Sequence, residues 1–165
     1  GTGNMKFAMN GALTIGTLDG ANIEIREQVG DDNIFIFGAT AEEVLARRNE
    51  GYDPSAFVDA DPRLAEVVDQ IANGAFSPDE PDRFAALAAD LRGKDWFQVA
   101  GDFSAYYDCQ RRVDEAWRDR DEWRRMAILN VARMGKFSSD VTVADYAAGI
   151  WGVPTPGWTA DAASP

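Results

Sequence analysis

The sequence predicts the closing part of an open α/β domain, followed by a mostly helical portion. Two apolar segments, 13–17 and 33–38, have the length and composition of strands, whereas apolar residues after residue 39 recur at helical spacing. Two parallel strands alone make a marginal sheet, with two edges and two faces to cover. We therefore expect further strands to precede residue 1, in a longer chain of which this sequence is the trailing part.

The first predicted strand follows a short helix. Asn4 is placed to cap a helix that continues to Met9, and Gly11 follows the predicted end of that helix. Residues 13–17 then form an apolar run that predicts a buried strand. The chain is thus expected to change from helix to strand within its first 17 residues.

A turn and a helix separate the two predicted strands. Asp19 and Gly20 make a turn-forming dipeptide, and residues 21–29 predict a short helix that Gly30 ends. Residues 33–38 are rich in β-branched and aromatic side chains and are bounded by turn formers. This composition suits a central strand of a parallel sheet, covered on both faces.

The rest of the chain predicts a series of helices. Thr40 and Glu43 have the capping-box spacing, Asp61 precedes a proline at a first helical position, and Asp119 can cap a later helix. In chain order, the predicted helices cover residues 40–48, 62–73, 81–91, 102–117, 120–134 and 142–150. The predicted organisation is an α/β end at 1–38, a helical portion at 39–152 and a flexible tail at 153–165.

Composition excludes several kinds of function. The 165 residues contain no histidine and one cysteine, Cys109, which excludes an internal disulfide, most metal sites and every histidine-based catalytic triad. A reducing, cytoplasmic setting is therefore the default expectation. The formal charge of −12 would repel a nucleic-acid backbone or an anionic lipid surface, and no segment is long and apolar enough to span a membrane. We expect neither a nucleic acid nor a membrane as partner.

The chemistry of the chain is expected at its glycine-rich beginning. Backbone N–H groups around Gly1 and Gly3 can converge on one point at a helix N-terminus, and Thr2 adds a hydroxyl, which together suit a phosphate. Lys6 is predicted in the first turn of that helix, where the macrodipole disfavours a cation. A bound dianion or conversion of the amine to an imine would relieve this cost, and pyridoxal phosphate provides both.

The same spacing is compatible with a plain glycine-rich turn. The segment is not a P-loop, which needs lysine directly after its last glycine, and it is not the dinucleotide fingerprint, because Lys6 occupies the final glycine position. From the residues alone, a cofactor site and a turn with a nearby lysine therefore both remain open.

The run from Gly1 to Asn22 closely resembles the pyridoxal-phosphate signature of the α-glucan phosphorylases, which act on glycogen, starch or maltodextrin. The similarity continues through the segments 33–38, 74–78, 135–140 and 150–152, so it spans nearly the whole chain before the tail. This resemblance implies a retaining glycosyltransferase of the two-Rossmann-domain (GT-B) type. Residues 1–38 would then close its Rossmann-like C-terminal domain.

The resemblance also implies roles for individual residues. Lys6 would be the catalytic-site residue that carries pyridoxal 5′-phosphate as an imine, and Thr2 and Gly3 would hold the phosphate of the cofactor. Gly1 would lie against the sugar in the catalytic cleft. The implied reaction is cleavage of α-1,4-glucan by inorganic phosphate to release glucose 1-phosphate, in a cytoplasmic enzyme that forms a homodimer.

Part of the family's machinery lies outside this sequence. In the family, the signature opens with Glu-Ala-Ser or Glu-Ala-Cys directly before the position of Gly1, and the basic residues that hold the substrate phosphate also come earlier. The remainder of a phosphorylase chain is therefore an expected partner. We expect the 165 residues by themselves to have no phosphorolytic activity.

Other candidate sites have simpler explanations. Asp19 and Glu24 could form a catalytic carboxylate pair, but a turn role explains Asp19 better. Packing or solvation is the favoured role for Tyr106, Tyr107, Trp117, Cys109 and the arginine pairs 111–112 and 124–125. The remaining alternative to an enzyme is a non-catalytic module that binds an anion or docks on a partner.

Overall fold

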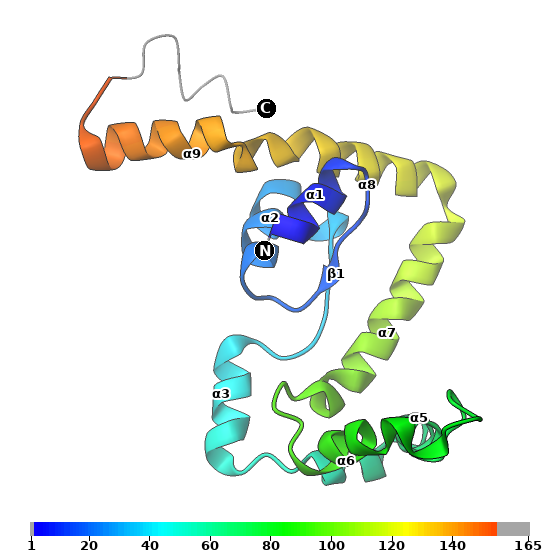
Figure 1. Cartoon of the computed structure of the whole chain (residues 1–165). Coiled ribbons are helices and arrows are strands. Elements are labelled where there is room, and N and C mark those ends of the chain that lie inside the picture. The colour runs from blue at the N-terminus through cyan, green and yellow to red at the C-terminus, as the bar shows by residue number, and fades with distance from the viewer. Residues whose placement is uncertain (1, 155–165) are drawn as a thin grey trace. The chain divides into compact units, whose positions relative to one another are not determined.

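The computed structural model describes residues 2–154, and these form two compact units. Of the described residues, unit 1 comprises 2–36 and 113–154, and unit 2 comprises 37–112. Helices dominate both units, as Figure 1 shows, and the sheet is limited to two short strands of unit 1. The expectation of a small parallel sheet with a mostly helical remainder is therefore confirmed.

Unit 1 pairs its two strands in parallel, with Ile15 opposite Phe35 and Gly16 opposite Ile36. In chain order it contains α1 (Thr2–Met9), β1 (Ile15–Gly16), α2 (Ala21–Val29), a 3₁₀ turn (Asp31–Asn33), β2 (Phe35–Ile36), α8 (Arg120–Arg133), a 3₁₀ turn (Met134–Phe137), α9 (Ser139–Tyr146) and a π-helical turn (Ala147–Trp151). The long helix α7 (Val99–Arg118) begins in unit 2 and ends in unit 1.

The core of unit 1 lies where α1 and α2 meet α8, and Figure 1 shows both short helices beside it. The buried members of this core are Ala8, Ile25, Val29, Ile34 and Met134. A buried amide completes the contact, because Asn130 Nδ2 on α8 donates to the backbone oxygen of Asn33 at 2.9 Å. Elements 97 residues apart in sequence are thus joined by one side chain.

The strands are shorter than the sequence predicts. β1 covers two residues instead of 13–17, and its Ile15 is exposed, so the expected buried strand is wrong at that position. β2 also covers two residues, because Asn33 belongs to the preceding 3₁₀ turn. Among the described residues each strand is hydrogen-bonded to one other strand. Within residues 2–154 neither strand has a neighbour on its other side, where further hydrogen bonds and burial would lengthen it.

Unit 2 is a helical cluster around a core of Val58, Leu64, Val68, Ala88 and Ala100. Its helices are α3 (Ala41–Glu50), α4 (Pro54–Ala60), α5 (Pro62–Ala72) and α6 (Ala85–Gly93), with a 3₁₀ turn (Pro81–Phe84) before α6 and the first part of α7 after it. The predicted capping box is confirmed, because Thr40 Oγ1 accepts from Glu43 N and Glu43 Oε2 accepts from Thr40 N.

Three helices begin earlier than predicted, and one was not predicted. α1 begins at Thr2 instead of Asn4, α7 at Val99 instead of Asp102, and α9 at Ser139 instead of Thr142. For α7 the reason is Asp95, whose carboxylate accepts from Val99 N and Ala100 N at 2.9 and 2.8 Å. For α9 the cap is Ser138, and the unpredicted α4 is capped by Asp53.

No helix within residues 2–154 is long and apolar enough to cross a membrane. The predicted tail lies outside the described residues from residue 155 onward.

Replacing Gly74 by alanine should destabilise unit 2. Gly74 has φ +80, which disfavours any side chain, and an added Cβ would lie 2.5 Å from the Cα of Pro81. We expect a loss of about 2 kcal/mol or more in the free energy of unfolding, from strain and overlap together. Gly93→Ala is the matched control, because open space surrounds Gly93 within its helix. Urea unfolding followed by circular dichroism should give that variant wild-type or slightly higher stability, and equal effects would contradict the assignment.

Candidate functional site

The helix α1 carries the predicted cofactor residues, and its bounds change the position of Lys6 within the helix. Because the eight-residue helix begins at Thr2, Lys6 lies in its last turn, where the macrodipole favours a cation. The predicted helix-dipole penalty on Lys6 is therefore wrong. Its cause was the expected cap at Asn4, whose amide instead lies inside the helix and donates to Asn22 Oδ1 at 2.8 Å.

Thr2, Gly3 and Lys6 share one face of α1. Lys6 follows Thr2 by four positions and Gly3 by three, and residues at these spacings are neighbours on a helix surface. All three are exposed, whereas Ala8 on the opposite side is fully buried. A helix start also leaves its first backbone N–H groups without intrahelical acceptors, so the donors at the beginning of α1 are free to bind a ligand beyond the helix end.

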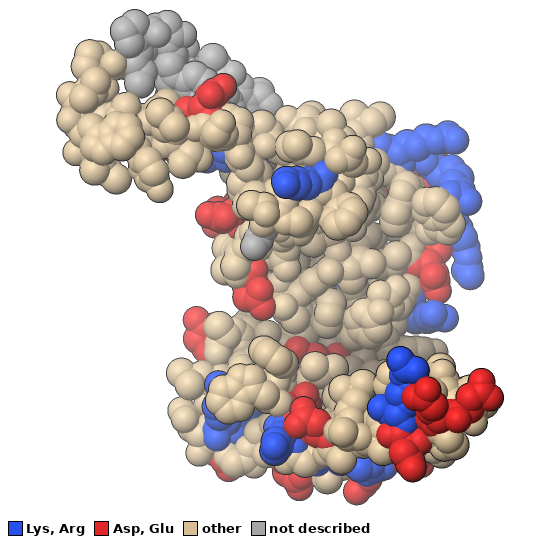
Figure 2. All heavy atoms as spheres, viewed as in Figure 1, with Lys and Arg blue, Asp and Glu red and all other residues tan. Residues whose placement is uncertain are grey.

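The surroundings of this face fit an organic phosphate. An added Cβ at Gly3 would meet nothing within 4 Å, so a ligand can approach the backbone there. Phe7 is 69% exposed and Met9 54%, which leaves apolar area on either side of Lys6. Within residues 2–154 no acidic side chain pairs with Lys6, and Figure 2 shows little charge over the part of unit 1 where α1 lies. An aromatic ring with a phosphate group matches such a surface.

Asn22 fixes the orientation of α1. Its Oδ1 accepts from Asn4 Nδ2, and its Nδ2 donates to the backbone oxygen of Thr17 at 2.9 Å. Gly16 makes room for this amide, because an added Cβ there would lie 2.6 Å from Asn22 Nδ2. Asn22 lies within the run that resembles the cofactor signature, but no local sequence pattern marks it as a functional residue.

Asp19 has a structural role in the same region. Its carboxylate accepts from Thr17 Oγ1 at 2.8 Å, and its backbone oxygen accepts from Asn22 N at the start of α2. Gly20 follows with φ 47. The interpretation of this dipeptide as a turn is confirmed.

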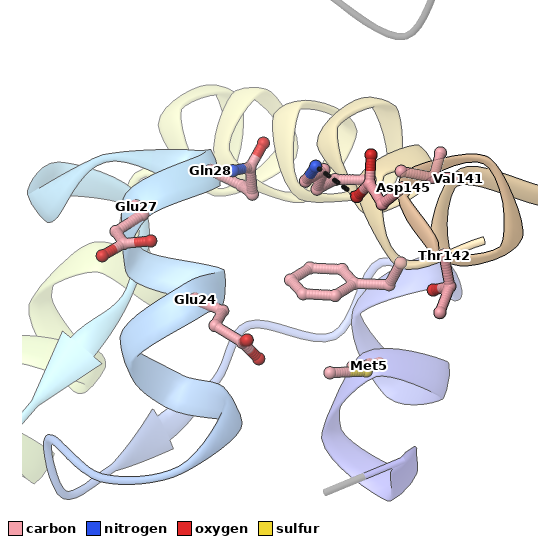
Figure 3. Close-up of a pocket in the computed structure, with 9 residues that line it drawn as sticks. Met5, Glu24, Glu27, Gln28, Val141, Thr142 and Asp145 are labelled. Atoms are coloured by element: carbon pink, nitrogen blue, oxygen red, sulfur yellow. Dashed lines mark ion pairs between the residues drawn. The ribbon is translucent and has the colours of Figure 1, made fainter. Parts of the chain in front are cut away.

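A cavity of about 410 Å³ lies on the other side of α1, between α1, α2 and α9 (Figure 3). Met5 contributes to its lining from α1, whereas Lys6 does not. Glu24, Glu27 and Asp145 also line it, and Lys136 forms an ion pair with Asp145, with Nζ and Oδ2 3.6 Å apart. Three carboxylates beside one lysine would repel a phosphate, so this cavity is a poor cofactor site.

The other sequence candidates have the structural roles expected of them. Cys109 is fully buried, and Arg124 and Arg125 pair with acidic residues three positions earlier in α8. The Glu122 pKa is lowered by its hydrogen bonds from Arg125, as in an ordinary surface ion pair. Trp117 packs edge-on against Trp123. The predicted sugar-binding position, Gly1, lies outside the described residues.

Comparison with known proteins places the chain in a family. The family profile described as "Carbohydrate phosphorylase" matches residues 1–153. The chain belongs to the carbohydrate phosphorylase family.

Several curated relatives are similar over almost the entire chain. Glycogen phosphorylase of Synechocystis sp. is 56% identical over 153 residues, which cover 93% of this chain and 18% of the relative. Glycogen phosphorylase of Haemophilus influenzae is 52% identical, with 93% and 19% covered. The brain form of glycogen phosphorylase from Homo sapiens is 50% identical, with 93% and 18% covered. The chain thus spans about a fifth of the length of the curated relatives that it matches.

Replacing Asn22 by alanine should loosen α1. The change removes the acceptor for Asn4 Nδ2 and the donor to Thr17 O, two bonds worth about 0.5–1.5 kcal/mol each. We expect the backbone amides of α1 to exchange with deuterium about tenfold faster or more, because this local opening becomes easier. Asn10→Ala is the matched control, since Asn10 is exposed, directly follows α1, and its amide donates locally, to Lys6 O. Similar exchange rates in both variants would contradict the anchoring role of Asn22.

Proposed function

We propose that this chain forms the cofactor-binding end of an α-glucan phosphorylase. The enzyme would cleave α-1,4-glucan with inorganic phosphate and release glucose 1-phosphate, using pyridoxal 5′-phosphate. The observation that carries the proposal is the shared exposed face of Thr2, Gly3 and Lys6, in a segment within the family match. The relatives at 50–56% identity are named glycogen phosphorylases, which supports the choice of substrate class.

Each residue of this face has a defined task in the proposal. Lys6 Nζ attaches the cofactor, and its exposed position in the last turn of α1 leaves the amine accessible. Backbone N–H groups at Thr2 and Gly3, with the Thr2 hydroxyl, hold the phosphate of the cofactor. When bound, pyridoxal phosphate supplies a phosphate group that exchanges a proton with the substrate phosphate. Phe7 and Met9 flank the amine and keep water from it once the face is covered.

The same proposal includes the expected partners and architecture. Residues 1–38 would close a Rossmann-like domain of a GT-B glycosyltransferase, with the helical residues 39–152 following it. The remainder of a phosphorylase chain would supply the residues that bind glucan and inorganic phosphate, and the intact enzyme would be a homodimer. The alternative is a non-catalytic module that binds an anion. Such a module needs no covalent bond at Lys6, so detection of that bond distinguishes the two functions.

In a full-length phosphorylase that carries this sequence, Lys6→Ala should abolish covalent cofactor binding. Borohydride reduction followed by mass spectrometry of the peptides should find the cofactor on Lys6 in the wild type and nothing at that position in the variant. Glucose 1-phosphate release should fall by at least about a thousandfold, because the cofactor is no longer positioned. Lys6→Arg keeps the charge but should fail equally, since a guanidinium cannot form the bond.

Lys136→Ala is the matched lysine control for this experiment. Lys136 pairs with Asp145 in the acidic cavity, so its loss should leave adduct and turnover unchanged. The 165-residue chain by itself serves as the blank and should release no glucose 1-phosphate. A wild-type enzyme without adduct at Lys6 would refute the proposal and favour the anion-binding module.

Thr2→Val should weaken cofactor binding without removing the attachment point. A hydrogen bond to a charged phosphate contributes about 1.5–3 kcal/mol, so the dissociation constant of pyridoxal phosphate should rise roughly 10- to 150-fold. Absorbance titration of the apoenzyme measures this change, and Thr2→Ser should restore most of the affinity. Thr142→Val is the control, because Thr142 donates locally to Ser138 O. Unchanged affinity in Thr2→Val would remove the hydroxyl from the proposed site.

A further inference from the structure

Unit 2 contains a separate polar pocket next to the start of α7. Its volume is about 240 Å³, below the roughly 300–1,000 Å³ of pockets for drug-sized ligands, so it suits one small ring. The residues that line it are Arg48, Gly51, Tyr52, Lys94, Asp95, Trp96 and Gln98. This combination of aromatic, amide and charged side chains has no part in the function proposed above.

A rigid frame holds this pocket. Asp95 is almost fully buried, and its carboxylate accepts from Val99 N, Ala100 N and the hydroxyl of Tyr52, the last at 2.7 Å. Burial, reinforced by this bond, raises the pKa of Tyr52 well above its usual range, so the hydroxyl stays protonated. Asp95 and Gln98 both have positive φ, a backbone conformation that costs about 1–3 kcal/mol per residue and persists only where other contacts fix it.

One buried polar atom of this frame has no partner. Gln98 is 1% exposed, and its Nε2 donates to Val44 O at 2.9 Å. Its Oε1 has no hydrogen-bond donor among the described residues. Leaving a buried acceptor unsatisfied costs about 1–3 kcal/mol, so a donor from a ligand or a water is expected there.

An exposed indole lies at the same place. Trp96 is 66% exposed although it lines the pocket, and the Arg48 guanidinium lies over its ring at 4.5 Å from the centroid. Arg48 is held there by donating to Trp96 O at 3.1 Å. An indole fixed in this way offers a flat apolar surface beside polar donors and acceptors.

The chemistry of the pocket favours a neutral polyhydroxyl ring over an anion. A phosphate carries few or no donors for Gln98 Oε1, and it would meet the carboxylate of Asp95 in the same pocket. A sugar offers hydroxyl donors to Gln98, hydroxyl acceptors to Arg48 and Lys94, and a C–H face to the indole. We propose that this pocket of unit 2 binds one glucosyl unit of an α-1,4-glucan as a non-catalytic subsite. The choice of glucan among sugars rests on the proposed function.

The test is binding of maltoheptaose to a full-length phosphorylase that carries this sequence. Hydrogen exchange should show protection of residues 94–98 on addition of the sugar. Trp96→Ala should weaken binding at this site at least about tenfold in calorimetric titration, and Trp96→Tyr should retain most of it. Phe97→Ala is the matched control, because Phe97 is 82% exposed but does not line the pocket, and it should bind like the wild type.

The outcomes separate this subsite from the catalytic proposal. In Lys6→Ala enzyme the protection of 94–98 should persist, because the pocket does not include Lys6. Intact protection in a wild-type enzyme that shows no phosphorolysis and no adduct at Lys6 would overturn only the proposed function. If wild-type residues 94–98 show no protection, water alone serves Gln98 Oε1 and the subsite is refuted. Equal sugar affinity in Trp96→Ala and wild type, or protection by inorganic phosphate alone, would refute it as well.

Discussion

The candidate site depends first on the hydrogen bond between Asn4 Nδ2 and Asn22 Oδ1, because this bond decides which face of α1 points outward. Asn4 and Ala8 are four residues apart, so the polar bond and the buried apolar contact act on the same side of the helix. Successive residues of a helix are rotated by about 100°, and a slip of one position would therefore turn Lys6 away from the exposed face. The Asn22 amide packs directly against the backbone of Gly16, which leaves no space for a side chain at residue 16.

The position of Lys6 also determines the kind of chemistry it can do. In the last turn of α1 a cation lies at the favourable end of the macrodipole, so helix position supplies no pressure toward a covalent bond. The distinguishing features are instead the lack of an acidic partner among the described residues and the apolar side chains of Phe7 and Met9. Covering such a face takes the amine out of water, which is the setting in which lysine side chains act as nucleophiles. Lys6 can thus be accessible while this face of α1 is exposed and become desolvated once the face is covered.

Features set by neighbours in sequence were predictable, and features set by distant partners were not. The capping box at Thr40 and the caps at Asp61 and Asp119 follow from spacing alone, and the structure has all three. The start of α7 was misplaced because Asp95 caps it from four residues away, across a backbone with positive φ that no local pattern indicates. Strand lengths depend on neighbouring strands, and the Asn4–Asn22 hydrogen bond joins residues 18 positions apart. Neither feature could be predicted without knowing the fold. Lys6, Thr2 and Gly3 could be predicted as candidates from the sequence because the glycine-rich run is local, and their cofactor role stays a prediction.

Both proposed sites follow from the same physical reasoning, which is that polar groups are seldom held in place without partners. At α1 Thr2, Gly3 and Lys6 are exposed, and solvent can satisfy their polar groups, so exposure alone would not demand a ligand. At the start of α7 the situation differs, because Gln98 Oε1 is buried and no donor among the described residues satisfies it. The frame of Asp95 and Tyr52 keeps that acceptor fixed despite two strained residues. A folded chain retains such an arrangement when it has a use, and beside an exposed indole in a carbohydrate phosphorylase the simplest use is to hold a sugar ring.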